Sequence, residues 1–139
     1  MLVSITRLRL RSWFRIFKFY ELSTPAIDQA IKDPNCLAGA TYTGPGPTFW
    51  TATVWNDEAS MRNYTQTGAH QATLSWFARI CSEGAMTQYK SKKIELPEQH
   101  EIAKKLAQAP KFFRVDKPSA AQEAKTIPNM SPKLMRRFK

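Results

Sequence analysis

The chain has 139 residues, of which 42% are hydrophobic, and its 21 Lys and Arg residues outnumber 11 Asp and Glu, giving a formal net charge of +10. This composition favours one globular domain over a disordered chain. No apolar run approaches the roughly 20 residues that a membrane-spanning helix needs. There is no glycine-rich phosphate loop, paired-cysteine motif or HExxH motif, so the residues give hydrolytic and metal-dependent mechanisms little to work with.

The positive charge is concentrated towards the C-terminus. Residues 1–89 contain eight Lys or Arg and six Asp or Glu, whereas residues 90–139 contain thirteen and five, so the two parts carry +2 and +8. A basic segment can bind nucleic acid or an anionic membrane. Its basic residues are interspersed with Pro, Ala and Gln, without a stacking-aromatic motif, which argues against a nucleic-acid partner. We expect a solvated or packed tail, with an anionic surface as the alternative partner of residues 104–139.

The two cysteines, Cys36 and Cys81, lie far apart and have no second Cys or His at metal-binding spacing. In the absence of an export signal, we expect buried thiols in a reducing compartment and predict a cytoplasmic protein. The basic residues 1–19 loosely resemble a transit peptide. The near-alternation of apolar residues in the same stretch favours an opening strand instead.

The first half of the chain predicts a strand, a helix and a hairpin. Near-alternation predicts the strand at 2–10. A helical apolar period runs from Trp13 to the residue before Asp33, with a kink at Pro25. A short strand at 36–42 and an aromatic strand at 48–55 follow, joined by a Gly-Pro-Gly-Pro turn.

The second half predicts two helical stretches and a fourth strand. Asn56 or Asp57 caps a helix that ends near Tyr64, and a Thr-Gly break follows. A second helix is expected over 70–82, with Gly84 ending it, and a fourth strand over 85–96. The order is βαββαβ, which predicts an α+β fold of the ferredoxin-like type.

We assign residues 1–96 to this ferredoxin-like domain and residues 97–139 to a basic C-terminal helix and an extended tail. The helix could form over 98–108, with Ile102 and Leu106 on one side. The tail should pack on the core or a partner in places and fray at its end. The sheet should have one helix-covered face and one bare, aromatic face. Because exposed apolar patches of that size are rare on monomers, pairing of two bare faces predicts a homodimer.

His70 is the best single candidate for chemistry. It follows Thr67, Gly68 and Ala69 near a helix N-terminus, where the helix dipole lowers the pKa of an imidazole and favours its neutral form. A neutral imidazole can act as a base, a hydrogen-bond donor or an axial ligand to haem iron. The alternative is a cap or packing residue. His100, in a charged stretch, is expected to be solvated.

Aromatic residues recur at helical or strand spacing and could line a pocket for a flat apolar ligand or haem, although such residues often form a core. The residues that we select as the substrate pocket are Trp13, Trp50, Trp55, Tyr64 and Trp76. Arg7, Arg9 and Arg11 share one face of the first strand. Arg9 is the candidate for binding a haem propionate or an acidic substrate, and a solvated strand face is the alternative.

The segment FWTATVWNDEASMRNYTQTGAH at 49–70 resembles the strand–helix signature of the dimeric α+β barrel superfamily, which includes antibiotic-biosynthesis-type monooxygenases. More closely, three further segments resemble an uncharacterised bacterial family described as monooxygenase-like or spheroidene-monooxygenase-like. They are SITRLRLRSW at 4–13, LAGA at 37–40 and FFRVDKPSAA at 112–121. Together, the matched segments extend over most of the chain.

This resemblance implies a dimer with a cavity between sheet and helices, and oxygen chemistry on an apolar, polyene or aromatic substrate. Relatives include cofactor-free oxygenases and haem enzymes, so the cofactor is either haem or none. The histidine of carotenoid-oxidising relatives would correspond to His70. Of the Asn/Trp/His arrangement of cofactor-free members, only Trp55 or Trp76 with His70 is matched. The alternative is a non-catalytic small-ligand or haem-binding module whose basic tail docks a partner.

Overall fold

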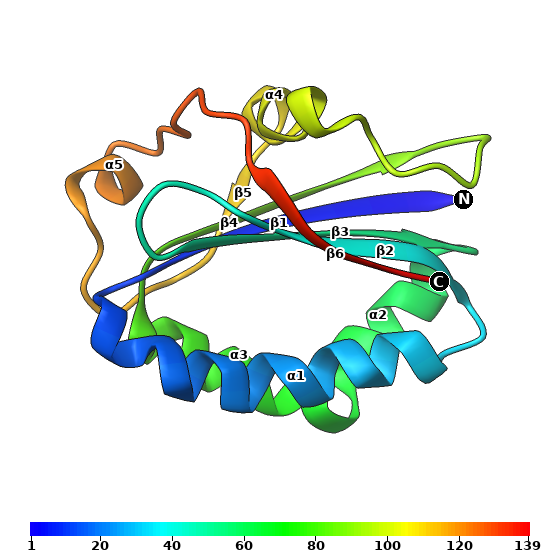
Figure 1. Cartoon of the computed structure of the whole chain (residues 1–139), viewed down its shortest axis with the longest axis horizontal. Helices are drawn as coiled ribbons and strands as arrows, with labels where there is room; N and C mark the ends of the chain where they lie inside the picture. The colour runs from blue at the N-terminus through cyan, green and yellow to red at the C-terminus, as the bar shows by residue number, and fades with distance from the viewer.

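The computed structural model describes residues 1–139 and contains one six-stranded antiparallel sheet with helices on both faces (Figure 1). The strand order is β5-β4-β1-β3-β2-β6. The strands are β1 (Leu2–Leu10), β2 (Cys36–Thr43), β3 (Thr48–Trp55), β4 (Cys81–Lys90), β5 (Lys111–Phe112) and β6 (Lys133–Phe138). The helices are α1 (Ile16–Lys32), α2 (Glu58–Gln66), α3 (Gly68–Ile80), α4 (Ile102–Gln108) and α5 (Ala120–Glu123), with 3-10 turns η1 (Trp13–Arg15) and η2 (Gln99–Glu101).

The central strands β4-β1-β3-β2 and the helices between them confirm the predicted ferredoxin-like α+β fold. Helices α1, α2 and α3 form a layer on one face of the sheet (Figure 1). The predicted cap is also present, because the Asp57 carboxylate accepts a hydrogen bond of 2.7 Å from the Ser60 backbone N–H at the start of α2. Both cysteines are buried free thiols, as expected. None of the helices is both long and apolar enough to cross a membrane.

The boundary between α3 and β4 was predicted wrongly. We expected a helix over 70–82, Gly84 as its stop and a strand from 85, but the helix ends at Ile80 and β4 begins at Cys81. Gly84 lies within β4, where a Cβ atom would come within 2.9 Å of the Phe113 ring. This glycine therefore makes room for a side chain from the C-terminal segment rather than ending a helix.

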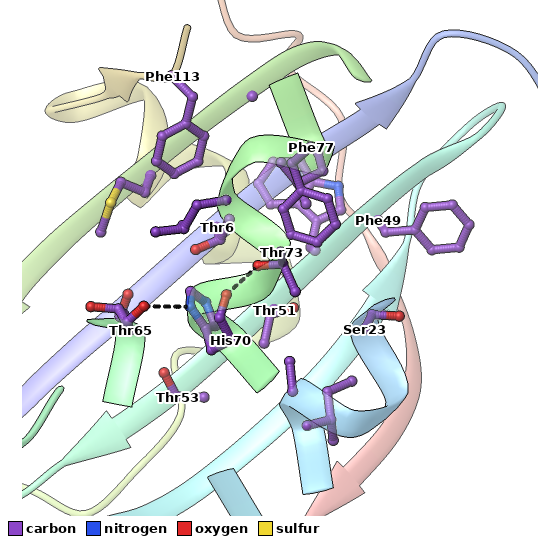
Figure 2. Close-up of a pocket in the computed structure, with 18 of the residues that line it drawn as sticks. Thr6, Ser23, Phe49, Thr51, Thr53, Thr65, His70, Thr73, Phe77 and Phe113 are labelled. Carbon is purple, nitrogen blue, oxygen red and sulfur yellow. Dashed lines mark hydrogen bonds between the residues drawn. The ribbon is translucent and has the colours of Figure 1, made fainter. Parts of the chain in front are cut away.

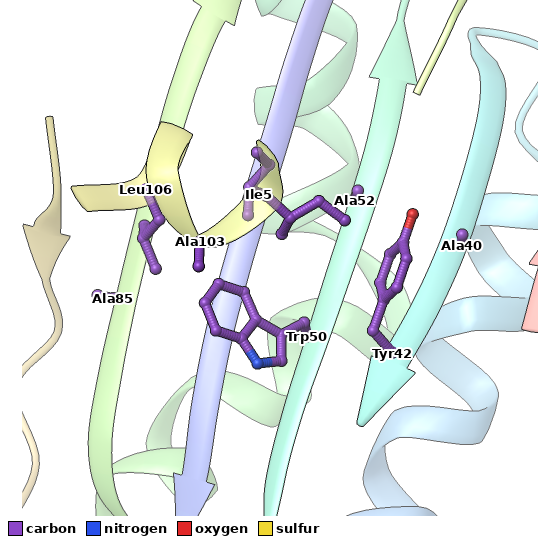
Figure 3. Packing of buried hydrophobic residues seen from close by; sticks show 9 residues of the cluster. Ile5, Ala40, Tyr42, Trp50, Ala52, Ala85, Ala103 and Leu106 are labelled. Carbon is purple, nitrogen blue, oxygen red and sulfur yellow. The ribbon is translucent and has the colours of Figure 1, made fainter. Parts of the chain in front are cut away.

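The face of the sheet that was expected to be bare is covered by the chain's own C-terminal segment. Helices α4 and α5 lie on the face opposite α1 to α3 (Figure 1). Ile102 and Leu106 of α4 pack against Ile5, Tyr42 and Trp50 of the sheet in a fully buried cluster (Figure 3). We predicted a homodimer because it would bury this aromatic face. The homodimer stays a prediction, but the face is already buried by α4, so this reason for a homodimer no longer holds.

The end of the chain does not fray. Strand β6 pairs with β2 at the sheet edge, and Phe138 is 6% exposed in a cluster that includes Trp55 and Tyr64. Gly39 lies directly beneath the Phe138 ring, where a Cβ atom would clash. The last residue, Lys139, donates a hydrogen bond of 2.7 Å to the Cys36 carbonyl oxygen. The tail is therefore part of the sheet on one edge, and β5 extends the other edge.

Candidate functional site

A cavity of about 1420 Å³ lies between the sheet and the layer of α1, α2 and α3. Pockets for drug-sized ligands are usually about 300–1,000 Å³, so the space is large enough for an extended or multi-ring molecule. Much of its wall is apolar, and both the helices and the sheet contribute to it. The large apolar residues that border it include Phe19, Phe49, Met61, Phe77, Met86 and Phe113.

The strands give the cavity a floor of hydroxyl groups. Alternation along β1, β2 and β3 turns one side chain of every two towards the helices. The Ser and Thr residues of β1, β2 and β3 that border the cavity are Ser4, Thr6, Thr41, Thr51 and Thr53. Thr53 accepts a hydrogen bond of 2.8 Å from the Trp55 indole N–H, whereas the other four hydroxyls have no protein partner and are not sealed from the cavity. They are free to bond water or a ligand.

His70 borders this cavity from the first turn of α3 (Figure 2). Its Nδ1 lies 3.1 Å from the Thr65 carbonyl oxygen, which can only accept a hydrogen bond. Nδ1 is therefore the protonated nitrogen in the neutral ring, and Nε2 carries the lone pair. Nε2 makes no hydrogen bond within the protein. Nε2 does not count as a buried atom that lacks a hydrogen bond, because Arg11 Nε is the one buried side-chain nitrogen or oxygen without a partner.

Neighbouring groups hold the imidazole in place. Gln29 of α1 accepts a hydrogen bond of 2.9 Å from the His70 backbone N–H and donates to the carbonyls of Tyr64 and Thr67. The Tyr64 ring packs on the imidazole with ring centroids 4.7 Å apart. Gly68 has a positive φ of 59° where the chain turns from α2 into α3, a conformation that favours glycine. The α2–α3 junction is thus fixed to α1 around His70.

Burial lowers the pKa of His70, and the hydrogen bond to the Thr65 carbonyl opposes this only in part. The direction is the one predicted from the sequence, but burial is its main cause rather than the helix dipole. At neutral pH the ring is neutral, with Nε2 available as a base or a ligand.

The lowered pKa of His70 predicts a loss of stability in mild acid. The imidazole of the unfolded chain binds a proton near pH 6.5, whereas the imidazole of the folded protein binds one only at a lower pH. The contribution of the neutral ring to the free energy of unfolding is therefore complete above pH 6.5 and is lost as the pH falls through the folded-state pKa. We expect the free energy of unfolding of the wild type to fall below pH 6.5 more steeply than that of His70→Asn. Urea unfolding at a series of pH values checks this. The same pH dependence of the free energy of unfolding in the two proteins would contradict a lowered pKa of His70.

The structure brings only some of the predicted pocket residues to the cavity. Tyr64 borders it beside His70. Trp50 also touches it, but its indole packs against α4 on the other face of the sheet (Figure 3). Trp55 is fully buried behind Tyr64, with ring centroids 4.8 Å apart. Trp13 and Trp76 are 58% and 37% exposed on the outer surface and do not border the cavity.

Arg9 does not meet His70. Its guanidinium donates to the Pro45 carbonyl and the Thr48 hydroxyl at distances of 3.1 and 3.0 Å, and it lies 3.6 Å from the Glu83 carboxylate. Arg9, Pro45 and Thr48 border a small separate pocket of about 60 Å³. The structure therefore does not bring Arg9 to the cavity that His70 borders, since Arg9 belongs to the β2–β3 turn and the Glu83 ion pair. Arg7 makes a buried ion pair with the same carboxylate, at 3.2 Å.

The hydroxyl floor and the wall residues Phe19, Phe49 and Phe113 were missed as site residues. A signal for the floor was present, because Ser, Thr and apolar residues alternate along the segments SITRL and TFWTATVW. Their shared face could have been read from strand periodicity. Phe113 could not have been found this way, because it reaches the cavity from the C-terminal segment.

Comparisons with solved structures place this architecture among known folds. An antibiotic biosynthesis monooxygenase superposes with a TM-score of 0.60 at 17% identity, covering 67% of this chain and all of its own. The chain has the α+β fold of that monooxygenase. SnoaB, a cofactor-independent oxygenase from Streptomyces nogalater, gives a TM-score of 0.56 at 10% identity and covers 70% of this chain and 97% of its own. A conserved protein from Methanosarcina mazei gives 0.59 at 14%, covering 66% and 92%.

The sequence itself matches no protein-family model and no curated protein. The structural neighbours nevertheless confirm the resemblance to the ferredoxin-like α+β barrel proteins at the level of the fold. They cover about two thirds of this chain but nearly all of their own length. About a third of the chain is therefore additional to the shared fold.

Proposed function

We propose that the chain is a monooxygenase-like enzyme that oxidises an apolar, aromatic or polyene substrate in the cavity between the sheet and α1 to α3. The observation that carries this proposal is His70, which borders an apolar cavity and whose Nε2 has no protein partner. The likeness to an antibiotic biosynthesis monooxygenase and to a cofactor-independent oxygenase supports the reaction class. Because the fold alone does not establish a function, the proposed activity rests on the residues of the site.

The residues support one acid–base step. Neutral His70 can take a proton from an acidic C–H or O–H group of a bound substrate at Nε2, while its Nδ1–H stays bonded to the Thr65 carbonyl. The deprotonated substrate is more easily oxidised by dioxygen. When a CH₂ group becomes a carbonyl, one oxygen atom enters the substrate and the other leaves as water with the two hydrogens. The free floor hydroxyls of Thr6 and Thr51 can hold polar groups of the substrate.

Tyr64 has a different role. Its hydroxyl donates a hydrogen bond of 2.8 Å to the Ala26 carbonyl oxygen, and burial raises the pKa of its phenol. The phenol therefore stays neutral and engaged with α1. We assign it to packing against the imidazole rather than to proton transfer.

A haem-dependent form of the proposal is favoured by the same nitrogen. Nε2 would hold the iron, and the Nδ1–H bond to a carbonyl is the second contact that commonly orients a ligating histidine. Bound haem would supply the activation of dioxygen. His70 is suited to bind the haem iron. Arg9 cannot bind the haem propionates, because the contacts of Arg9 are in the separate pocket. A non-catalytic ligand-binding module is the remaining alternative.

Filling the cavity tests whether it binds an apolar ligand. Ser23 of α1 borders the cavity, so Ser23→Trp should weaken binding of retinol, a polyene probe, at least about tenfold. Gln71→Trp, on the exposed side of α3, is the matched control and should bind as the wild type does. Retinol fluorescence measures the affinity. Equal weakening in both variants, or no effect of Ser23→Trp, would contradict the assignment of the cavity as the ligand site.

A further inference from the structure

The largest exposed apolar side chains of the helical layer gather at one end of α1. Phe14 and Phe17 are 94% and 83% exposed, and Trp13 beside them is 58% exposed. Isolated exposed apolar residues are ordinary, but a contiguous group of aromatic rings on one surface marks an interaction site. The members of this aromatic patch are Trp13, Phe14, Phe17 and Tyr20 from η1 and α1, and Leu74 and Trp76 from α3.

The two helices contribute to a single surface. Helices α1 and α3 pack along each other (Figure 1). Lys18 of α1 places its ammonium 4.0 Å from the Trp76 ring centroid, and the Arg79 guanidinium lies 5.3 Å from the same centroid. The start of α1 and the end of α3 are therefore adjacent, and cations are interleaved with the aromatic rings.

The patch carries net positive charge. Arg15, Lys18 and Arg79 lie on it, and the acidic residue beside them is Glu21, which pairs with Lys18 at 3.5 Å. Asp116, whose backbone bonds to the end of α3, lies 3.9 Å from Arg114, so that pair adds no net charge. The surface thus presents exposed aromatic rings together with unbalanced cations.

We propose that this aromatic patch docks the protein on the surface of an anionic lipid bilayer. Tryptophan, tyrosine and phenylalanine partition into the interface of a bilayer, and nearby Lys and Arg are attracted to anionic headgroups. Phe14 and Phe17 project furthest into solvent and would enter the interface, with Arg15 and Lys18 at headgroup level. A second copy of the chain is a poorer occupant, because symmetric pairing of this patch would bring its cations together.

The position of the patch bears on how a substrate reaches the cavity, and this step rests on the function proposed above. Tyr20 and Leu74 belong to the patch and also border the cavity. Docking would therefore bring the bilayer to residues of the cavity wall, where an apolar substrate dissolved in the bilayer could enter without crossing bulk water. Docking itself does not depend on catalysis, so the two proposals fail separately.

Vesicle co-sedimentation tests the docking. The wild type should bind vesicles of phosphatidylcholine with phosphatidylglycerol at least about tenfold more tightly than vesicles of phosphatidylcholine alone. The double variant Phe14→Ser, Phe17→Ser should lose about tenfold or more of that affinity. Because both rings are almost fully exposed, the fold does not depend on them, and circular dichroism verifies this. Ile94→Ser, another exposed apolar residue, is the matched control and should bind normally.

Charge is tested separately with Arg15→Gln combined with Arg79→Gln, which should weaken binding to the anionic vesicles, whereas Arg114→Gln should not. Absence of wild-type binding to anionic vesicles would overturn the proposal, as would full binding by the phenylalanine variant. Concentration-dependent association without lipid, abolished by the same two substitutions, would identify the patch as a self-association surface and also overturn it. Retinol binding by the docking-deficient variant in detergent solution reports on the cavity independently.

Discussion

Replacing Leu106 by alanine is expected to lower the free energy of unfolding by about 2–5 kcal/mol, the range for a fully buried leucine. Leu106 is 0% exposed and packs with Ile102 of α4 against Ile5 and Trp50 of the sheet. The side chains around it are themselves buried in the same cluster, so the space left by the leucine would close only in part. Urea unfolding followed by circular dichroism measures the effect. Lys104→Ala, on the exposed side of the same helix, is the control and should change stability by less than about 0.5 kcal/mol.

The same substitution probes what covers the second face of the sheet. If α4 is the cover, loosening it with Leu106→Ala and Ile102→Ala together should expose Trp50 and Tyr42 and promote self-association. Sedimentation velocity would show species that grow with protein concentration, alongside a wild type that does not change. Wild-type stability of Leu106→Ala would contradict the packing of α4 on the sheet. A wild-type homodimer that survives the double substitution would have to use another surface.

The four central strands could be predicted because their signals are local. Alternation in the first strand, the Gly-Pro-Gly-Pro turn and the aromatic run after it each specify a conformation within a few residues. The order of these elements then allows few topologies. The α3–β4 boundary was predicted wrongly because the role of Gly84 is to make room for Phe113, which approaches it from a distant part of the chain. Such a contact has no local signature.

The cover of the second face also depends on distant contacts. Ile102 and Leu106 stand four residues apart, and this spacing predicted an amphipathic helix. The spacing does not say which surface the apolar side meets. Likewise, Phe138 finds its place only because Gly39 leaves room beneath its ring.

The site was predicted in part. His70 could be selected because its residue type and its place at a helix start both point to a neutral imidazole, and the structure does place it at the cavity. Trp13 and Trp76 were selected because aromatic residues at helical spacing can line a pocket. Large aromatic residues on a helix can face the core, a cavity or solvent, and these two face solvent. The walls are made instead by phenylalanines such as Phe19 and Phe49, whose sequence spacing is no more distinctive.

Replacing His70 by alanine or asparagine is expected to lower oxygen-dependent turnover by about 100-fold or more, the usual contribution of a positioned general base. The asparagine variant separates chemistry from structure. Its side-chain amide can occupy the place of Nδ1 and donate to the Thr65 carbonyl, but it has no counterpart of Nε2. Alanine loses that hydrogen bond as well, which should cost about 0.5–1.5 kcal/mol of stability. His100→Ala, in the η2 turn, is the matched control and should retain full activity.

Oxygen uptake with retinol and with dihydroxynaphthalene, as polyene and aromatic probes, measures turnover, and retinol fluorescence measures binding in the same proteins. Loss of turnover in both His70 variants with retained retinol binding is the result expected of a catalytic base. Wild-type turnover by His70→Asn would show that Nε2 is not used. Absence of uptake by the wild type with both probes would contradict an oxygenase for these substrate classes and favour the ligand-binding module.

A haemin titration of the same three variants distinguishes the two forms of the proposal. If Nε2 binds haem iron, the Soret band of the wild type and of His100→Ala should shift alike as haemin is added. His70→Ala and His70→Asn should then both lose that shift, because neither side chain supplies an imidazole. If all the proteins give the spectrum of free haemin while the wild type still consumes oxygen, His70 acts on the substrate itself. The lone pair that the Thr65 hydrogen bond leaves on Nε2 then serves as the base.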